Sequence, residues 1–144
     1  LSPLATTGYP AGRLSQMATA HSRRMAEEGA VSTSVNSNTT LNRYEAYQLN
    51  EYCSFPSNNG YTTINARSGE IELVGNPVDA LSGSNTERGF QFDTRNVAET
   101  TVTRWRNSQL SRQKHEYTNA ERMGIGVTVS RDGGVFITVS LCGE

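Results

Sequence analysis

The apolar positions at the start of the chain repeat at the period of a helix. From Arg13 to Gly29 they recur at steps of three and four residues, which predicts an amphipathic helix. Its buried stripe is predicted to consist of Leu14, Met17, Ala18, His21 and Met25. Gly29 suits the C-cap of this helix, where a positive φ is needed. The spacing of apolar residues over 41–49 predicts a second, shorter helix.

The end of the chain alternates between apolar and polar residues, as strands do. Apolar residues occupy every second position over residues 125–129 and again over 135–141. Asp132-Gly133 lies between the two runs and is among the strongest short signals for a β-hairpin. Runs at 61–64 and 70–74 flank a turn with Gly69 and predict another hairpin. A short buried strand is expected around Cys53 and Phe55.

A third helix is predicted from Asn96 onward. Asn96 is a good N-cap, and Glu99 three residues later completes a capping box. Trp105 lies on the apolar face of this helix and is expected to anchor it in the core. Helices, short strands, a further helix and a terminal hairpin together predict an α+β layered fold. A length of 144 residues indicates one domain, residues 1–144.

Composition and charge exclude several classes of function. The 13 Lys and Arg residues are balanced by 14 Asp and Glu residues, so no basic field attracts nucleic acid. No run of about 18 apolar residues predicts a membrane span. The abundance of Ser, Thr and Asn, with Lys114 as the only lysine, favours a secreted or cell-surface protein.

Cys53 and Cys142 are the two cysteines of the chain. Two thiols do not form a structural zinc site alone, because such a site takes about four ligands. In a secreted protein they would form one disulfide that closes a loop of about 90 residues and stabilises the fold by about 4–5 kcal/mol. The alternative is a pair of buried free thiols.

Two segments carry a resemblance to a known family. Trp105-Arg106-Asn107-Ser108 lies on the third predicted helix, and Gly124-Ile125-Gly126-Val127 begins the terminal hairpin. In this order they resemble the CAP superfamily, which contains the cysteine-rich secretory, antigen 5 and pathogenesis-related proteins. The resemblance implies a three-layer α-β-α sandwich. Residues 56–95 are then an insertion, because the family has a much shorter linker there.

The resemblance also implies a central cleft without its usual metal site. The family places two histidines where this chain has Thr33 and Ser111, and Asn50-Glu51 takes the place of its acidic motif. Hydroxyl groups are poor zinc ligands, so we expect neither a metal nor another cofactor. Glu51 is either a remnant of the cleft or a buried carboxylate paired with an arginine or a helix hydroxyl. Ser108 lies beside Ser111 in the family's motif and is assigned to the cleft.

These residues favour a secreted, non-catalytic binding or interaction module with a degenerate cleft. Its partner is expected to be a protein, a lipid-like molecule or a glycan, bound by the cleft and the insertion. Tyrosine and phenylalanine side chains suit such an interface; the candidates are Tyr9, Tyr44, Tyr47, Tyr52, Phe55, Tyr61, Phe90 and Phe92. For Tyr44 and Phe55 the alternative is a place in the core. The alternating pair Phe90 and Phe92 is expected either to form an edge strand or to grip a ligand.

Two alternatives remain open at this point. One is a hydrolase or protease that uses Glu51 with His21. Against it, His21 lies on an apolar stripe, where a histidine is more often a core residue, and the chain has no Gly-x-Ser-x-Gly nucleophile elbow. The other alternative is a structural domain of a larger surface protein.

Overall fold

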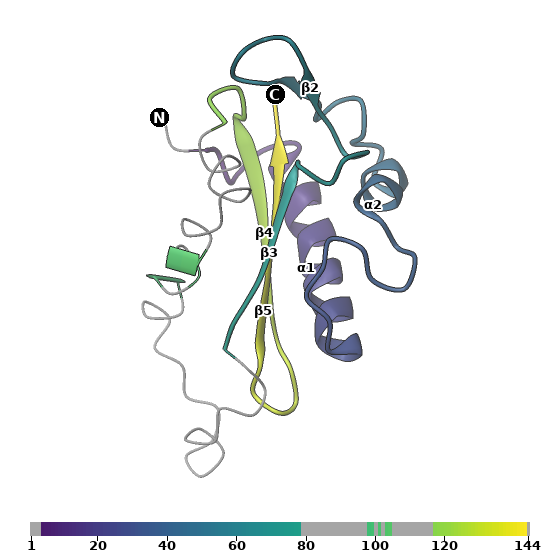
Figure 1. Cartoon of the computed structure of the whole chain (residues 1–144), viewed down its shortest axis with the longest axis vertical. Helices are drawn as coiled ribbons and strands as arrows, with labels where there is room; N and C mark the ends of the chain where they lie inside the picture. The colour runs from purple at the N-terminus through teal and green to yellow at the C-terminus, as the bar shows by residue number, and fades with distance from the viewer. Residues whose placement is uncertain (1–3, 79–97, 100, 102, 105–116, 144) are drawn as a thin grey trace.

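The computed structural model describes residues 4–78, 98–99, 101, 103–104 and 117–143. Its helices and antiparallel strands confirm the α+β class (Figure 1). The elements in chain order are α1 (Ala11–Glu28), α2 (Thr40–Ala46), β1 (Phe55–Pro56), β2 (Thr63–Ile64), β3 (Glu72–Val78), β4 (Arg122–Val129) and β5 (Val135–Cys142).

Helix α1 forms where the periodicity predicts it. It begins at Ala11, two residues before the predicted start, and ends at Glu28; Gly29 follows as the C-cap, and its φ of 65° is the left-handed conformation. The N–H of Ala30 donates to the carbonyl of Met25 and satisfies one of the last carbonyls of the helix. All five residues of the predicted stripe, Leu14, Met17, Ala18, His21 and Met25, are fully buried.

Helix α2 is shorter than predicted. The Thr39 side chain caps its start by accepting a hydrogen bond from the N–H of Asn42. The helix ends at Ala46, three residues before the predicted end at Leu49. Leu49 is still fully buried, because the turn that follows α2 leads it back into the core.

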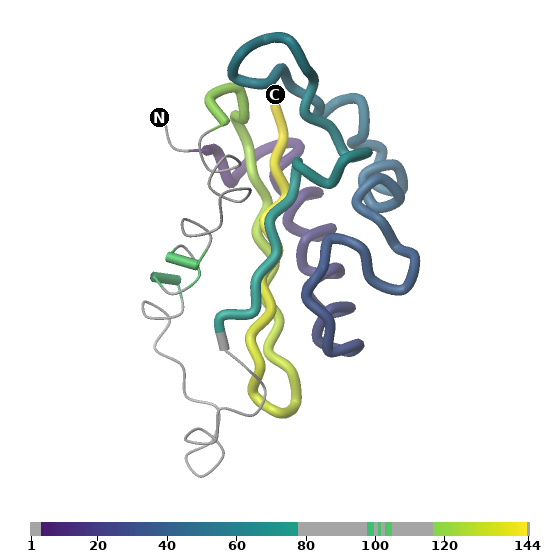
Figure 2. Tube along the Cα trace, viewed as in Figure 1, coloured from purple at the N-terminus to yellow at the C-terminus, as the bar shows by residue number. Residues whose placement is uncertain are grey.

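The main sheet has the strand order β3-β5-β4, and both pairs are antiparallel. The predicted terminal hairpin is confirmed, with Val129 paired to Val135 next to a turn in which Gly133 has a φ of 90°. Helices α1 and α2 lie on the same side of this sheet (Figure 2). The core between them and the sheet contains Tyr44 and Leu14.

Helix α1 packs against β4 through two glycines. A Cβ added to Gly126 would lie 2.1 Å from the backbone nitrogen of Thr19, and one added to Gly124 would lie 2.3 Å from that of Ser15. Real Cβ atoms do not approach so closely, so both positions require glycine. The helix backbone therefore rests directly on the strand.

The predicted hairpin of residues 61–64 and 70–74 is wrong in its pairing. Strand β2 pairs with β1, with Phe55 opposite Ile64. Strand β3 pairs instead with β5, with Glu72 opposite Ser140. Gly69 does adopt a turn conformation, with a φ of 73°. The turn therefore lies where it was expected, but the two strands beside it belong to different sheets.

The third predicted helix lies partly within the described residues. Residues 98–99, 101 and 103–104 are helical, and the Arg104 side chain donates to the carbonyl of Asn76 at 2.9 Å. This contact ties the segment to β3. Asn96 and Trp105 lie outside the described residues. Within the described part of the chain, no helix has the length and apolar character that crossing a membrane requires.

Candidate functional site

The charged side chains of the interior gather around Glu72, which is fully buried at the start of β3. Its Oε1 forms an ion pair with Arg43 of α2 and accepts from the hydroxyl of Thr40 at 3.1 Å. Its Oε2 accepts from the hydroxyl of Ser140 on β5 at 2.8 Å. Side-chain donors from α2 and β5 thus hold the carboxylate, as a buried charge requires.

Arg43 connects this carboxylate to the loop between the two helices. Its guanidinium donates to the carbonyl of Thr33 at 2.8 Å and to that of Asn38 at 2.9 Å. Only 4% of Arg43 is exposed, and its Nε has no hydrogen-bond partner among the described residues. We call Arg43, Glu72, Thr40 and Ser140 the buried cluster. Its geometry fixes α2 and the preceding loop against the sheet.

His21 borders the buried cluster from α1. Its Nε2 lies 2.7 Å from the carbonyl of Ser32, so Nε2 carries the proton and donates. Its Nδ1 is buried without a hydrogen-bond partner among the described residues. Burial and the nearby Arg43 guanidinium lower the pKa of His21, against the opposing effects of the Ser32 carbonyl and the Glu72 carboxylate. The imidazole is therefore neutral at neutral pH.

Two hydroxyl groups extend the polar contacts between α1 and the sheet. Ser22 donates to the carbonyl of Gly126 at 2.9 Å, and its oxygen lies 2.8 Å from the Thr138 hydroxyl. Since Ser22 has one hydroxyl proton, Thr138 is the donor in the second bond. Tyr44 similarly donates to the carbonyl of Leu141 at 2.7 Å. Burial and the Glu72 charge raise the pKa of Tyr44 well above its usual value.

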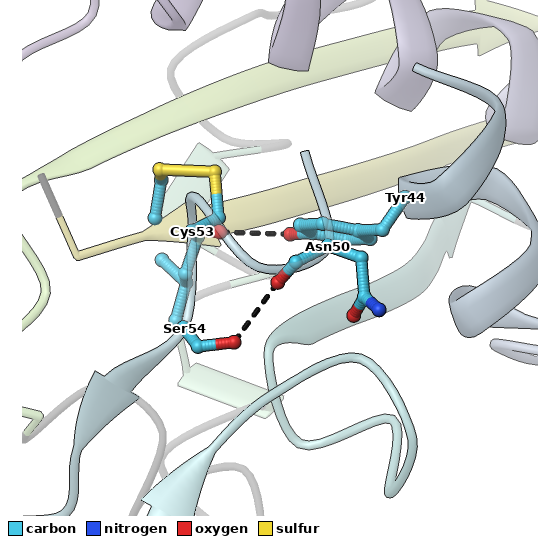
Figure 3. The surroundings of a disulfide bond; sticks show 6 residues. Tyr44, Asn50, Cys53 and Ser54 are labelled. Carbon is cyan, nitrogen blue, oxygen red and sulfur yellow. Dashed lines mark hydrogen bonds between the residues drawn. A yellow bond between two sulfur atoms is a disulfide. The ribbon is translucent and has the colours of Figure 1, made fainter. Parts of the chain in front are cut away.

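Of the predicted cleft residues, Thr33, Asn50 and Glu51 lie within the described part of the chain. Thr33 reaches the buried cluster through its backbone carbonyl. Asn50 and Glu51 lie in the turn after α2, and the Asn50 carbonyl accepts a hydrogen bond from the Ser54 hydroxyl (Figure 3). Glu51 is exposed. The predicted site residues outside the described part of the chain are Ser108, Ser111, Phe90 and Phe92.

Glu72 is the buried carboxylate that sequence reasoning sought at Glu51. It is paired with an arginine and a helix hydroxyl, and it is the carboxylate whose charge acts on His21. The signal was present in residues 70–74, where Ile71 and Leu73 alternate with Glu72. A strand with both faces buried places that glutamate inside. Its partner Arg43 is 29 residues away and carries no comparable signal.

The predicted disulfide between Cys53 and Cys142 is confirmed. It joins the turn after α2 to the end of β5, and both cysteines are fully buried (Figure 3). The N–H of Gly143 donates to the carbonyl of Cys53 at 3.0 Å and continues this connection. The covalent bond therefore closes the core at the end of the sheet where Tyr44 is anchored.

Exposed tyrosines lie near the disulfide and in the loop before β2. Tyr9 and Tyr52 are 58% and 47% exposed and form an edge-to-face pair with ring centroids 5.5 Å apart. Tyr61 is 89% exposed in the loop between β1 and β2. Figure 1 shows β2 at the same end of the molecule as the C-terminal end of β5. We call Tyr9, Tyr52 and Tyr61 the exposed tyrosines.

A shallow surface groove of about 460 Å³ lies along the outer side of α1. Its lining consists of Ser15, Gln16, Thr19, Ala20, Arg23 and Tyr47. Most of its lining surface is apolar, and the Thr19 hydroxyl is already used by the carbonyl of Ser15. The groove thus offers few directed polar groups for chemistry.

The chemistry that these arrangements allow is limited. Glu72, Arg43 and His21 are at most 4% exposed, so their functional groups do not meet a solvent-borne substrate. Among the described residues, no group of three or more His, Cys, Asp or Glu side chains is placed to hold a metal ion. No family model matches this chain, and no curated protein and no solved structure is significantly similar to it.

Proposed function

We propose that this protein is a secreted, disulfide-bonded binding module of the CAP type that acts without catalysis. One contrast carries the proposal. His21, on which the hydrolase alternative depends, and the Glu72 carboxylate are both at 0% exposure, whereas Tyr61 is 89% exposed. Enzymes present their acid and base to a substrate, and interfaces present aromatic rings.

Two features support the CAP assignment. Gly124 and Gly126, from the segment that carries the resemblance, are the positions at which α1 rests on β4. The antiparallel sheet has α1 on one face, and the helical residues near Arg104 contact β3 through Asn76. In a CAP sandwich a helical layer covers the second face of the sheet. An experimental structure with no helix on that face would contradict the assignment.

We infer that the partner is a protein bound through the exposed tyrosines. Tyrosine brings a large, rigid contact area at low entropic cost, and Ser and Asn beside it supply adaptable hydrogen bonds. Asn58 and Asn59 precede Tyr61 in its loop. The Asn58 side chain accepts from the N–H of Thr118, which holds this loop against the segment before β4. Ordering of the loop before binding lowers the entropic cost of association.

The test compares three forms of the protein as bait for extracellular proteins of its source. The forms are the wild type, the triple variant Tyr9→Ser/Tyr52→Ser/Tyr61→Ser and the control Val31→Ser, which removes an apolar side chain that is 46% exposed. We expect quantitative mass spectrometry to find a partner with the wild type and the control and to lose it with the triple variant. Equal recovery with all three contradicts the proposal.

A parallel assay addresses the hydrolase alternative. Casein and a short-chain ester are incubated with the wild type, His21→Ala and Glu51→Ala. We expect no turnover by any of them. Turnover by the wild type that both substitutions abolish would establish the alternative in place of a non-catalytic module.

A further inference from the structure

The connection between α1 and α2 contains an acceptor sequence for N-linked glycans, Asn38-Thr39-Thr40. Such a sequence consists of an asparagine, then any residue except proline, then a serine or threonine. It occurs once in the chain, because no other asparagine is followed two residues later by a serine or threonine. Any N-linked glycan of this chain is therefore attached to Asn38.

Asn38 lies directly after a tight turn. Its N–H donates to the carbonyl of Val35 at 3.0 Å, and the N–H of Val35 donates back to its carbonyl at 3.3 Å. The two residues between them, Asn36 and Ser37, are exposed and have φ values of 51° and 63°. Figure 1 shows the connection that contains this turn on the outside of the fold, beside α2. The turn thus holds the backbone of Asn38 at the surface.

The side chain of Asn38 is partly exposed, and its amide nitrogen is available. Its Oδ1 accepts from the Arg43 guanidinium at 3.3 Å, whereas its Nδ2 makes no hydrogen bond within the described part of the chain. A glycan is joined to Nδ2 and leaves the amide oxygen in place, so the contact with Arg43 is retained. The neighbouring Ser37 and Asn42 are exposed and polar, as the surroundings of a hydrated glycan should be.

We propose that Asn38 carries an N-linked glycan, which is transferred before α2 docks on the sheet. In this transfer, Nδ2 forms a bond to the anomeric carbon of an oligosaccharide that is linked to a lipid diphosphate. The bond between that carbon and the phosphate oxygen breaks, Nδ2 loses a proton, and the lipid diphosphate leaves with the bonding electron pair. The proposal rests on the secretion stated in the proposed function, because the secretory compartment supplies the lipid-linked donor and the transferase.

Thr40 determines when the transfer takes place. The transferase must reach the hydroxyl of this residue, because a serine or threonine is required at that position. In the folded protein Thr40 is 3% exposed, and its hydroxyl donates to Glu72 at 3.1 Å. Glu72 lies 32 residues later in the chain, and Ser140, which also donates to this carboxylate, lies a further 68 residues on. The hydroxyl is therefore accessible until β3 and β5 have been synthesised and is enclosed afterwards.

The first experiment directs the full chain into the secretory pathway of a eukaryotic cell and treats the product with peptide N-glycosidase. We expect the mass of the wild type to fall on treatment and that of Asn38→Gln to stay unchanged. The matched control Asn42→Gln makes the same substitution at an exposed asparagine outside the acceptor sequence and should still carry the glycan. Thr40→Ser keeps a hydroxyl and should also be glycosylated. Circular dichroism verifies that the variants fold.

A second experiment tests the order of transfer and folding. Unglycosylated wild type is produced in a host without the transferase and is then incubated with purified transferase and a lipid-linked oligosaccharide. One sample is folded and oxidised, and the other is reduced, denatured and diluted into the reaction. We expect transfer to the diluted chain and little or none to the folded protein, because folding encloses Thr40.

Three results would overturn the proposal. They are a secreted wild type whose mass the glycosidase leaves unchanged, a glycan that persists in Asn38→Gln, and transfer to the folded protein as fast as to the diluted chain. The first of these leaves the proposed function intact, since an unglycosylated protein can still bind its partner through the exposed tyrosines. Conversely, a glycosylated wild type that captures no more partner than the triple tyrosine variant would contradict the proposed function alone.

Discussion

The two faces of β4 differ in how they make contact. The face toward α1 carries Gly124 and Gly126, and the helix backbone lies directly on them. The opposite face carries Ile125, Val127 and Val129, which are 43–52% exposed. The strand therefore buries its two glycines and exposes three of its aliphatic side chains. The difference shows that alternation alone predicts two distinct faces but not which of them is buried.

The strongest test of this comparison is to add a side chain to the glycine face. In Gly126→Val the new Cβ would lie only 2.1 Å from the backbone nitrogen of Thr19, so α1 must move off the sheet. We expect the variant not to fold, as judged by circular dichroism and by the dispersion of its NMR spectrum. Val127→Thr, on the exposed face, should change stability by no more than about 0.5 kcal/mol.

A glycine without such a contact provides the control. Gly12 lies in the first turn of α1, and a Cβ added there meets nothing within 4 Å. Gly12→Ala should stabilise the protein by about 0.5–1 kcal/mol, because alanine loses less backbone entropy in a helix. A folded Gly126→Val variant, or an unfolded Gly12→Ala variant, would refute the account of the glycine face.

The next largest effect is expected from the covalent bond that closes the core beside these faces. The double variant Cys53→Ser/Cys142→Ser releases a crosslink between residues 89 positions apart in sequence. In the chain-entropy model this costs about 4–5 kcal/mol. Urea denaturation with and without a reducing agent measures the loss. A reducing agent should destabilise the wild type and leave the double variant unchanged.

The next largest loss of stability is expected from the buried cluster. It lies on the same face of the sheet as the two glycines. Arg43→Met leaves the Glu72 carboxylate buried without its cation, which typically costs about 3–5 kcal/mol. The double variant Arg43→Met/Glu72→Met removes both charges and should recover most of that loss. A double-mutant cycle from urea denaturation gives the coupling between them. Additive losses would mean that the two charges do not depend on each other.

Much of the fold could be predicted from local patterns. The stripe of α1, the cap at Gly29 and the hairpin around Gly133 are consequences of short-range spacing, and the structure confirms them. The pairing of strands β2 and β3 could not be predicted in this way. Two short runs beside a glycine turn suit a hairpin, but the partners of Glu72 and Ile64 are chosen by long-range packing.

The same limit applies to the candidate site. The spacing placed His21 on a buried face, as the structure confirms. The family resemblance pointed to Glu51 as either a cleft remnant or a buried, paired carboxylate; Glu51 is exposed, and Glu72 is the carboxylate that is buried and paired. An ion pair between residues 43 and 72 depends on how α2 packs on the sheet, and no local pattern encodes that packing. The disulfide could be predicted because only two cysteines were available.

The smallest expected effect is a dependence of stability on pH that originates at His21. Its pKa is below 6.5 in the folded protein, because of burial and the Arg43 guanidinium, and near 6.5 in the unfolded chain. As the pH falls below 6.5, the unfolded state binds a proton that the folded state does not, and stability decreases. The slope is at most about 1.4 kcal/mol per pH unit, and stability above pH 6.5 is unaffected by this group.

Urea denaturation from pH 7.5 downward should show this loss, at roughly the stated slope, in the wild type. The same loss should appear in Arg23→Gln, because Arg23 is an exposed residue of α1. It should be absent from His21→Gln, whose amide can still donate to the Ser32 carbonyl without titrating. Identical pH profiles for the wild type and His21→Gln would show that the His21 imidazole is not the group responsible for the loss of stability.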